Sequence, residues 1–290
     1  MKTKILFIVN PIAGNGKSAK SADSIGKWID RERFDFAIAQ TEHRGHATEL
    51  ARQAAAAGFD VVAAIGGDGT VNETACGLVG TRTALAIIPH GSGDGLALHL
   101  QIPRNVRGAM QVINSGSPML ADSGIVCGHR FFTTTGVGYD AKVAYDYAQA
   151  HSRGLKTYIA KALADWRSYE PANYIITTES ERVETRAMLV TVGNANQWGN
   201  RCHITPLASI ADGLLEVTIV RPITTLQAPG VLRRLFRYDA YSSPHIMHLQ
   251  ARNITIERSH DFEAHFDGEA ILLPARVEVQ CCAGSLYIWR

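Results

Sequence analysis

Short apolar runs alternate with segments of helical spacing over residues 4–88, and this alternation limits the fold more than any other feature of the chain. Runs typical of buried strands cover 4–9, 35–40, 61–65 and 85–88. Helical spacing falls between them, over 18–30, 46–57 and 71–79. Strands that are joined by crossover helices pair in parallel. The pattern therefore predicts an α/β domain built on a parallel sheet.

The sequence changes in character after about residue 122. Its segments become short, bounded by turn residues and rich in Val, Ile, Thr and aromatic residues, as in RFFTTTGVGYDA, NYIITTES, AMLVTVGNA, LLEVTIV and NITIERS. Such segments are typical of antiparallel strands. One segment of helical spacing, from Ala141 to about Trp166, interrupts them, and the closing segment SLYIWR is predicted to be a strand that returns to the first half. We expect two domains, 1–123 with about 284–290, and 124–283.

The stretch VNPIAGNGKS at 9–18 resembles the Walker A loop of P-loop NTPases but departs from it at one position. That loop needs a glycine six places before its lysine, and Pro11 stands there instead. Proline has no N–H to offer a phosphate and fixes φ. We therefore expect the Lys17-Ser18 pair not to form a phosphate cradle, and a nucleotide to be held elsewhere.

A glycine loop follows the predicted strand at 61–65 and leads into a predicted helix. Glycine lets the backbone approach a ligand closely, and the helix N-terminus offers unpaired N–H groups to an anion. A turn without a ligand is the structural alternative. A carboxylate among such amides makes sense mainly with Mg²⁺ between it and a phosphate, so we favour a phosphate site. The loop reads Gly66-Gly67-Asp68-Gly69-Thr70.

A second glycine loop, PHGSGDGLALHL, follows the predicted strand at 85–88. By itself it is ordinary turn chemistry. Two such loops on neighbouring strands describe a crevice at the carboxyl edge of a parallel sheet, where ligands of open α/β folds bind.

Two Asp-Gly pairs lie beside apolar strands in the second half, in PLASIADGLLEV and HFDGEA. A hairpin turn is the structural alternative for each pair. Asp267 and Glu269 flank a single glycine, and alternation along an extended strand would point both carboxylates the same way. Paired acids suit metal binding or proton transfer.

Composition removes several classes of function. A formal charge of +2 creates no strong field, so we expect no nucleic-acid partner. The five cysteines show no CxxC spacing, and their odd number without a leader sequence indicates a reducing, cytoplasmic interior. The eleven histidines show no His-x-x-x-His or Cys/His cluster, which gives a zinc site little support. No apolar stretch approaches the roughly 18 residues of a spanning helix, so contact with lipid is expected to be peripheral.

Six motifs occur along nearly the whole chain in one order: NPIAGNGKS, GGDGTVNE, PHGSGDGLA, GVGYDA, PLASIADGLLEV and FDGE. In order and spacing this set is similar to the diacylglycerol kinase catalytic-domain family of lipid kinases, and most like its soluble bacterial members. Sphingosine and ceramide kinases are relatives, and NAD kinases and phosphofructokinases share the GGDG loop. The resemblance implies an NAD kinase-like α/β domain followed by a mostly antiparallel β-sandwich. It also implies transfer of the γ-phosphoryl group of ATP to a lipid hydroxyl, with Mg²⁺, at a membrane surface.

The resemblance also assigns roles to single residues. The ATP site would be formed by the two glycine loops and three further residues, namely Asn10, Thr41, Gly66, Gly67, Asp68, Gly69, Thr70, Glu73, Gly91, Ser92, Gly93 and Asp94. Asp267 matches the general base of bacterial diacylglycerol kinases, and would be joined in a magnesium and water network by Glu269, Asp68 and Asp122. In sphingosine kinases the base is the aspartate of the GGDG loop, Asp68 here; we favour Asp267. A structural magnesium site would use the carbonyls of Ser209 and Leu214 and the carboxylates of Asp212 and Asp122.

One departure from the family pattern leaves the acceptor open. Diacylglycerol kinases have Gly-Thr-x-Asn-Asp-Phe-Ala in the second glycine loop, whereas this chain has GSGDGLA, which is closer to sphingosine kinases. The ammonium of a sphingoid base could pair with Asp94 or Asp140; a loop or cap aspartate is the alternative for each. The rival functions are an NAD kinase-like kinase of a soluble acceptor and a nucleotide-binding regulator without catalysis. Asp68 together with the Asp267/Glu269 pair argues against the regulator.

The basic run around residue 234 has two interpretations. Arg233, Arg234 and Arg237 stand among apolar residues and could lie on an anionic membrane surface. A solvated helix face explains the run equally well. A second copy of the chain, in a homodimer, is a further partner that we consider.

Overall fold

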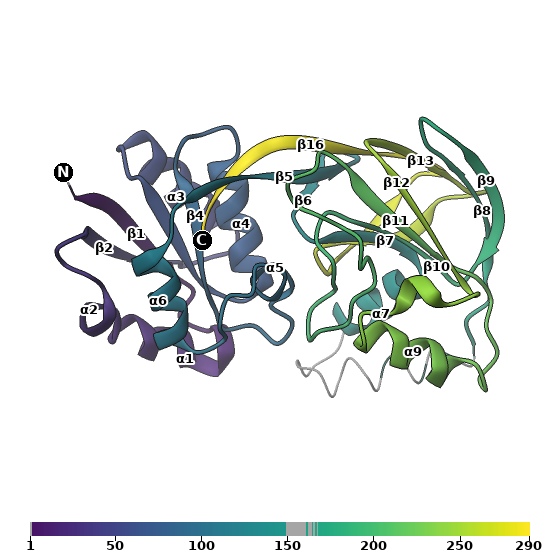
Figure 1. The fold of residues 1–290 in the computed structure, drawn as a ribbon, viewed down its shortest axis with the longest axis horizontal. Helices are drawn as coiled ribbons and strands as arrows, with labels where there is room; N and C mark the ends of the chain where they lie inside the picture. Colours follow the sequence, from purple (N-terminus) through teal and green to yellow (C-terminus); the bar gives the residue numbers. More distant parts are fainter. Residues whose placement is uncertain (1, 149–160, 162–163, 165, 167) are drawn as a thin grey trace. The chain divides into compact units, whose positions relative to one another are not determined.

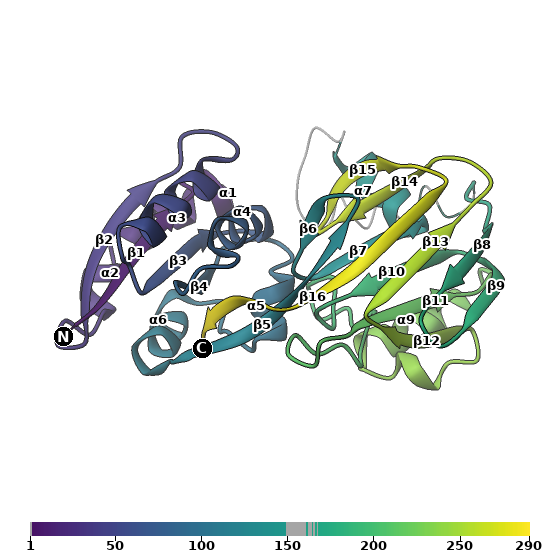
Figure 2. The ribbon, with the colours of Figure 1, turned by 90° about the horizontal axis from the view of Figure 1, so that it is seen from above.

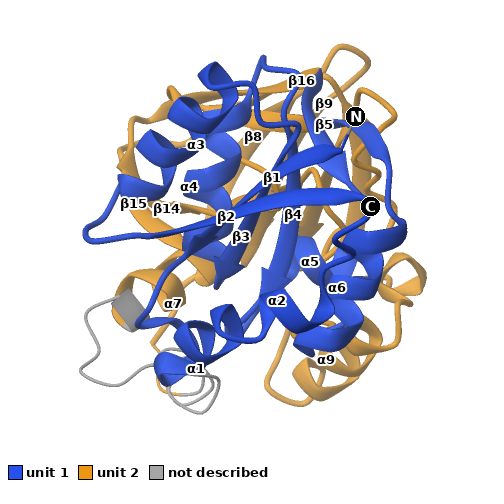
Figure 3. Ribbon diagram, turned by 90° about the vertical axis from the view of Figure 1, so that its left-hand side faces the viewer, with its two compact units in different colours: residues 1–121, 284–290 blue, residues 122–283 orange. Residues whose placement is uncertain are grey.

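The structure is a computed structural model that describes residues 2–148, 161, 164, 166 and 168–290. The chain forms two compact units, Met1–Ala121 with Gly284–Arg290, and Asp122–Ala283 (Figure 3). The chain crosses between the units within two strands, β5 (Pro118–Val126) and β16 (Arg276–Trp289). Each unit has its own layers and core.

The first unit contains a parallel sheet in the order β2-β1-β3-β4. Its strands are β1 (Thr3–Val9), β2 (Phe34–Gln40), β3 (Val61–Gly66) and β4 (Ala84–Pro89). Every residue of β3 and β4 is buried, as expected of central strands covered on both faces. The end of β16 pairs in parallel with β4, with Ile288 opposite Leu85. The predicted parallel α/β sheet is thus confirmed.

Helices cover both faces of this sheet. One face carries α3 (His46–Ala56) and α4 (Asp68–Leu78), and the other carries α1 (Ala13–Ala22), α2 (Ile25–Trp28) and α6 (Val106–Ser115) (Figure 1). A short helix, α5 (Gly95–His99), follows the second glycine loop. The crossover helices place the carboxyl ends of all four strands at one edge.

Two predicted helices differ in their bounds. The helix predicted over 18–30 is divided into α1 and α2, and α1 begins within the stretch GNGKS. Gly14, Asn15 and Gly16 all have positive φ, from 56° to 79°, because two of these positions are glycine and the third is asparagine, the residues that adopt the left-handed region most readily. α4 begins at Asp68 rather than Val71, so the aspartate of the first glycine loop lies in the first turn of a helix.

The second unit contains two antiparallel sheets. One has the order β12-β11-β10-β7-β14-β15. Its strands are β7 (Thr134–Gly138), β10 (Leu189–Gly193), β11 (Leu215–Val220), β12 (Ile246–Ala251), β14 (Phe262–Phe266) and β15 (Glu269–Leu273). In the other, β13 (Asn253–Glu257) lies between the first part of β16 and β8 (Ala172–Thr177), and β9 (Arg182–Ala187) pairs with β8. The short β6 (His129–Phe131) pairs with β5.

The core of the second unit lies between its two sheets (Figure 2). One cluster combines buried residues of the first sheet, such as Val190, Val217 and Ile219, with Ile176 and Ile254 of the second. The mostly antiparallel β-sandwich is thus confirmed. Helix α7 (Tyr139–Ala148) contacts β7, β14 and β15, and α9 (Ala228–Phe236) precedes a short 3₁₀ turn, η1 (Ala240–Ser242). The rest of the helical segment predicted over 141–166 lies outside the described residues, apart from three isolated positions.

Candidate functional site

The two glycine loops of the first unit contact each other through their backbones. They follow neighbouring strands whose ends are in register, with Gly66 opposite Pro89. A Cβ added to Gly67 would lie 3.1 Å from the Cα of Gly91, and one added to Gly91 would lie 2.9 Å from the Cα of Gly67. Both positions therefore need glycine for packing, and the loops form one continuous backbone surface at the carboxyl edge of the sheet.

Asp68 joins the two loops by hydrogen bonds. Its Oδ2 accepts from the backbone N–H of Asp94 at 2.9 Å, and its Oδ1 accepts from that of Gly95 at 2.8 Å. These N–H groups open helix α5, where backbone donors lack partners within the helix. The side chain therefore holds the second loop in place.

Asp94 is fully engaged within its own loop. Its Oδ1 accepts from the N–H of Gly91 at 2.7 Å, and its Oδ2 accepts from Nε of Arg104 at 3.0 Å and from Nη2 at 2.8 Å. Arg104 also donates to the carbonyls of Gly91 and Ser92, at 2.8 and 3.1 Å. The carboxylate is 3% exposed and already has a cation, which argues against its pairing with the ammonium of an acceptor. Sequence reasoning missed Arg104, because no local pattern links it to the loop.

Asp140, the other candidate for an acceptor ammonium, is buried in the second unit. Its Oδ2 accepts from Thr191 Oγ1 at 2.9 Å and lies 3.2 Å from Nε2 of His265, while its Oδ1 accepts from the N–H of Ala141. The carboxylate is thus surrounded by partners inside the fold. Asp140 therefore acts as an anchor of α7, and the ammonium interpretation finds no free carboxylate at either position.

Two residues of the stretch 9–18 differ in their contacts: Asn10 reaches the first glycine loop, whereas Ser18 is used within the stretch itself. Asn10 Nδ2 donates to Thr70 Oγ1 at 3.1 Å, which connects the end of β1 to the first loop. Ser18 is fully buried, and its hydroxyl donates to the carbonyls of Asn10 and Ala13. A hydroxyl used in this way is unavailable to a phosphate. Thr41 stands at the same sheet edge, where its N–H donates to the carbonyl of Val9 at 2.8 Å.

Glu73 holds the start of α3 instead of facing open space. Its Oε1 accepts from the N–H of Gly45 at 2.9 Å and its Oε2 from that of Ala47 at 3.3 Å, and its carbonyl accepts from Thr48 Oγ1 at 2.8 Å. Helix α3 has no side-chain cap of its own, so Glu73 supplies one from a neighbouring helix. Its carboxylate positions the loop that follows Thr41, and its expected place in the lining of the ATP site stays a prediction.

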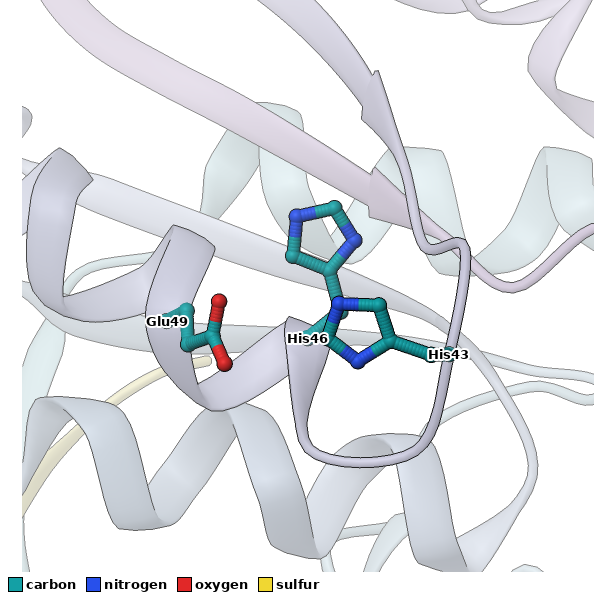
Figure 4. Close-up of side chains that lie close together, drawn as sticks. All are labelled: His43, His46 and Glu49. Carbon is teal, nitrogen blue, oxygen red and sulfur yellow. The ribbon is translucent and has the colours of Figure 1, made fainter.

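One side chain of that loop and two of α3 lie close together, although their spacing is not the His-x-x-x-His pattern sought in the sequence. Ligand-type atoms of His43, His46 and Glu49 lie within 4.8 Å of one another (Figure 4). The two imidazole rings are stacked, with centroids 4.7 Å apart and planes at 10°. Lone pairs of imidazole nitrogens lie in the ring plane, so stacked rings do not direct them to one point. Nδ1 of His46 also accepts from the N–H of Glu42 at 3.1 Å. The group is a stacked pair beside a carboxylate and not an assembled metal site.

His90 is a further residue that sequence reasoning missed. It follows β4 directly, and its Nε2 is buried without a hydrogen-bond partner in the described structure. Burial lowers its pKa from the usual 6.5; the charge of Asp94 acts in the opposite direction, and that of Lys17 adds to the lowering. The imidazole is therefore neutral near neutral pH.

In the second unit, Asp267 and Gly268 form the two-residue turn between β14 and β15. Both have positive φ, 46° and 83°, as a type I′ hairpin turn requires. The prediction that strand alternation points Asp267 and Glu269 the same way is therefore wrong, because the segment is not extended. Glu269 is the first residue of β15, opposite Phe266.

The Asp267 carboxylate binds the segment that precedes β7. Its oxygens accept from the backbone N–H groups of Phe132, Thr133 and Thr134, at 2.9, 2.8 and 3.1 Å, and from Thr133 Oγ1. This set of donors orients the carboxylate and fixes the turn against the sheet.

The expected magnesium loop lies at residues 209–214, and Asp122 reaches it. The buried Asp122 Oδ2 accepts from the N–H of Gly213 at 2.7 Å, and its own N–H donates to the carbonyl of Ile210 at 2.6 Å. Burial, followed by the charges of Asp122, Cys282 and Asp212, raises the pKa of Cys281 to about 12. Asp122 and Asp212 therefore both lie near the Cys281 thiol, as does Arg252, whose charge acts on this pKa in the opposite direction. Carboxylate and carbonyl oxygens are the ligands that a hard cation such as Mg²⁺ takes.

A second buried carboxylate, not predicted from the sequence, holds the start of the same loop. Glu216 Oε2 accepts from the N–H of Leu207 at 2.6 Å, and its Oε1 lies 2.6 Å from Nδ1 of His248. His248 comes from β12, so this contact spans 32 residues of sequence. The loop is therefore fixed at both ends by buried acids.

Two hollows on the surface of the described residues lie away from the glycine loops. One of about 500 Å³ lies where β3 and β4 begin, and is lined by residues that include Arg52, Phe59, Asp60 and Arg82. It contains none of the expected site residues. It lies at the amino ends of the parallel strands, opposite the edge where α/β folds bind ligands.

Comparison with known proteins finds lipid kinases for both halves of the chain. Residues 4–126 match the diacylglycerol kinase catalytic domain, and residues 133–288 match the YegS C-terminal NAD kinase beta sandwich-like domain. A probable lipid kinase YegS-like protein of Chromohalobacter salexigens is 30% identical over 264 residues, covering 88% of this chain and 85% of the relative. A diacylglycerol kinase of Bacillus subtilis is 27% identical over 269 residues, covering 91% and 88%. A solved putative diacylglycerol kinase of Bacillus anthracis has a TM-score of 0.80 at 25% identity, covering 98% of this chain and 94% of the other.

Proposed function

Because the chain belongs to the family of diacylglycerol kinases and YegS-like lipid kinases, we propose that it transfers the γ-phosphoryl group of ATP to a hydroxyl group of a membrane lipid. The first unit would bind ATP, and the second would supply the base, the metal loop and the acceptor site. The observation that carries the proposal is the Asp68 bridge between the two glycine loops.

This bridge supports phosphate binding for a physical reason. Phosphoryl transfer depends mainly on positioning and on neutralising charge. Gly67 and Gly91 leave backbone in contact with backbone, where any side chain would intrude. The first loop leads into α4, whose first N–H groups are donors for an anion. Asn10 and Thr70, linked by a hydrogen bond, and Thr41 at the end of β2 complete this edge.

Residues in and around the two glycine loops would hold the nucleotide in two ways. Gly69, Ser92 and Gly93 would offer backbone groups without bulky side chains. Asp94 and Arg104 would act indirectly, because their ion pair at 2.8 Å fixes the loop shape. Glu73 would also act indirectly, by holding the loop after Thr41.

The oxygen donors of the second unit fit Mg²⁺. The carboxylates of Asp122 and Asp212 and the carbonyls of Ser209 and Leu214 are all hard ligands, and Asp122 is already in contact with the loop that carries the others. When bound there, Mg²⁺ would supply rigidity and positive charge beside the acids of the second unit. Asp68 would help to hold the metal of the nucleotide in the first unit, and Glu269 would belong to the acids of the second unit.

We propose Asp267 as the general base. A lipid hydroxyl has a pKa far above neutrality, so a positioned carboxylate that receives its proton lowers the barrier. Asp267 is oriented by three backbone N–H groups and a hydroxyl, which restricts its rotation. Asp68, whose two oxygens hold the second glycine loop, is the alternative base.

A labelled-ATP assay tests the function and identifies the acceptor. The purified protein would be incubated with γ-labelled ATP, Mg²⁺ and, separately, diacylglycerol, a sphingoid base, ceramide, undecaprenol or NAD. We expect label in one or more lipids and none in NAD. Label in NAD alone would establish the soluble-acceptor rival. ATP binding without transfer to any acceptor would favour the regulator that lacks catalysis.

A further inference from the structure

Helix α9 displays apolar and basic side chains to solvent on the sides that do not pack against the unit. Its inward residues are Val231 and Leu235, which belong to a buried cluster with Ala240 and Ile246. Its outward residues include Leu232 and Phe236, which are 52% and 51% exposed. Residues four apart on a helix lie on the same side, so these two form a stripe along the outer surface.

Arginine side chains flank this stripe. Arg233 and Arg237 are also four residues apart and both are exposed. Among the residues that the structure describes, no carboxylate pairs with either of them, whereas Arg234 donates to Asp239 at 2.7 Å. We call Leu232, Arg233, Phe236 and Arg237 the α9 face.

The sequence around the α9 face is basic over a long stretch. Residues 221–238 read RPITTLQAPGVLRRLFRY, with four arginines and no acidic residue, in a chain whose formal charge is only +2. Leu226, just before the helix, is 93% exposed. Apolar side chains flanked by arginines on a helix that lies flat are what an anionic bilayer surface attracts, because the apolar groups enter the interface while the cations meet lipid phosphates.

We propose that the α9 face is the surface by which this protein docks on an anionic membrane. The inference deepens the proposed function and rests on it in part, since an enzyme acting on a membrane lipid must reach the bilayer. None of the described helices is long and apolar enough to cross a membrane, so α9 would lie along the interface. A second copy of the chain is the less favoured occupant, because a stable protein interface needs roughly 800 Å² per partner and one stripe of two apolar side chains is small against that.

Sedimentation with vesicles, without ATP, tests the proposal. The wild type should bind vesicles of phosphatidylglycerol and phosphatidylcholine and bind pure phosphatidylcholine far more weakly. R233Q/R237Q should lower partitioning to the anionic vesicles about 30-fold, from the contribution of about 1 kcal/mol that each arginine makes near such a surface. L232S/F236S should lower it at least tenfold by removing apolar burial. These four side chains are exposed, so the variants should fold, and circular dichroism would verify it.

Matched controls remove the same kind of group elsewhere in the second unit. R182Q/R276Q changes the net charge equally at two arginines that are 58% and 63% exposed. L272S removes a leucine that is 70% exposed. Both controls should bind anionic vesicles within about twofold of the wild type. The proposal would be overturned if the controls lost as much binding to anionic vesicles as the α9 variants do. It would also be overturned if the wild type bound anionic and pure phosphatidylcholine vesicles equally well.

Two further measurements separate this proposal from its alternatives. A wild-type dimer in sedimentation velocity that L232S/F236S dissociates would assign the α9 face to self-association and overturn membrane docking. Phosphorylation of a short-chain acceptor dispersed in solution should be unchanged in both α9 variants. Loss of vesicle binding in the α9 variants, with this activity intact, supports docking. Vesicle binding by a wild type that phosphorylates no lipid would overturn the proposed function but not the docking surface.

Discussion

Asp267 has more hydrogen-bond donors than proton transfer alone requires. Three backbone N–H groups and the hydroxyl of Thr133 converge on its two oxygens. The residue therefore has a structural role in holding the 132–134 segment, whatever its chemical role. A test of the base must separate these two effects.

We expect Asp267→Asn to lower turnover about 10² to 10⁴-fold, because the amide cannot accept the proton of the lipid hydroxyl. The variant should also be less stable, by about 1.5–3 kcal/mol, since an amide NH₂ replaces one charged acceptor of backbone N–H groups. Turnover at saturating ATP, Mg²⁺ and acceptor would be compared with the free energy of unfolding in urea.

Thr133→Val is the matched control, because it removes one donor to the same carboxylate and leaves the carboxylate itself. It should cost about 1 kcal/mol in stability and change turnover less than about threefold. Near wild-type turnover in Asp267→Asn, with Asp68→Asn inactive at every Mg²⁺ concentration, would move the base to the glycine loop.

His90 should make stability depend on pH. Burial lowers its pKa in the folded state below the usual 6.5, so the unfolded chain binds a proton at higher pH than the folded chain does. The favourable contribution of the neutral imidazole is therefore complete above pH 6.5 and is lost as the pH falls through the lower folded value. We expect His90→Gln to lose less stability than the wild type between pH 7.5 and pH 5.5.

Urea unfolding at pH 7.5, 6.5 and 5.5 would measure this difference. His260→Gln removes an exposed histidine and controls for the loss of one titrating group. A constant difference between the wild type and His90→Gln across the three pH values would show that His90 is not the group responsible.

At the scale of the element, contact between the glycine loops should control nucleotide binding. A Cβ at Gly67 would lie 3.1 Å from the Cα of Gly91, so Gly67→Ala must displace the second loop. Gly91→Ala meets Asp94 Oδ1 at 2.6 Å and Gly67 at 2.9 Å, and should act in the same way. We expect both to weaken ATP binding about tenfold or more in calorimetric titration, which is about 1.4 kcal/mol or more.

Gly230→Ala is the control for glycine removal, because its Cβ meets nothing within 4 Å and it lies within helix α9. It should leave ATP affinity unchanged and raise stability by about 0.5–1 kcal/mol. If folded Gly67→Ala and Gly91→Ala bound ATP as tightly as the wild type does, the contact between the loops would not control nucleotide binding.

The loop at 209–214 allows a parallel test of the metal. Asp212→Asn removes a charged ligand and should raise the Mg²⁺ concentration needed for half-maximal activity several-fold. Ser209→Ala keeps the carbonyl that would bind the metal, so it should leave this concentration unchanged. Equal Mg²⁺ dependence of activity in the wild type and Asp212→Asn would show that the loop at 209–214 is not a magnesium site.

Sequence patterns predicted the elements better than the contacts between them. The alternation at 4–88 yields the parallel sheet, because buried strands and amphipathic helices are encoded locally. Strand alternation failed at Asp267, because a two-residue turn reverses the chain there. Glycine spacing located both loops, but their connection through Asp68 and the Arg104 ion pair arises only from folding.

The hydrogen-bond partners of Glu216 and Glu73 could not be predicted from the sequence for the same reason. Glu216 meets His248 across 32 residues, and Glu73 meets Gly45 across 28. No local period records such pairs. The family motifs include both Glu73 and Glu216, but they did not reveal the structural role of Glu73 and gave no role to Glu216.

At the scale of the whole molecule, the first unit is completed by the last residues of the chain. Trp289 is 7% exposed, its Nε1 donates to the carbonyl of Ile113 at 2.9 Å, and its ring meets Phe34 edge-on at 6.1 Å. The guanidinium of Arg33 lies 5.3 Å from the same ring. The core of the first unit therefore depends on a residue that follows the entire second unit in sequence.

We expect Trp289→Ala to destabilise the first unit by about 3–5 kcal/mol, because it removes a large buried ring and leaves the Ile113 carbonyl without its donor. Hydrogen exchange should then show lost amide protection in β3 and β4 and retained protection in β10 and β11. ATP binding should weaken in step with the protection of β3 and β4.

Val217→Ala gives the converse experiment, since Val217 is fully buried in the core of the second unit. It should lower protection in β10 and β11 and leave that of β3 and β4 in place. Each unit has its own hydrophobic core and most contacts lie within units, so local opening of one should not require opening of the other. If both variants instead lower protection equally in all four strands, β5 and β16 transmit the loss, and the two units unfold as one cooperative body.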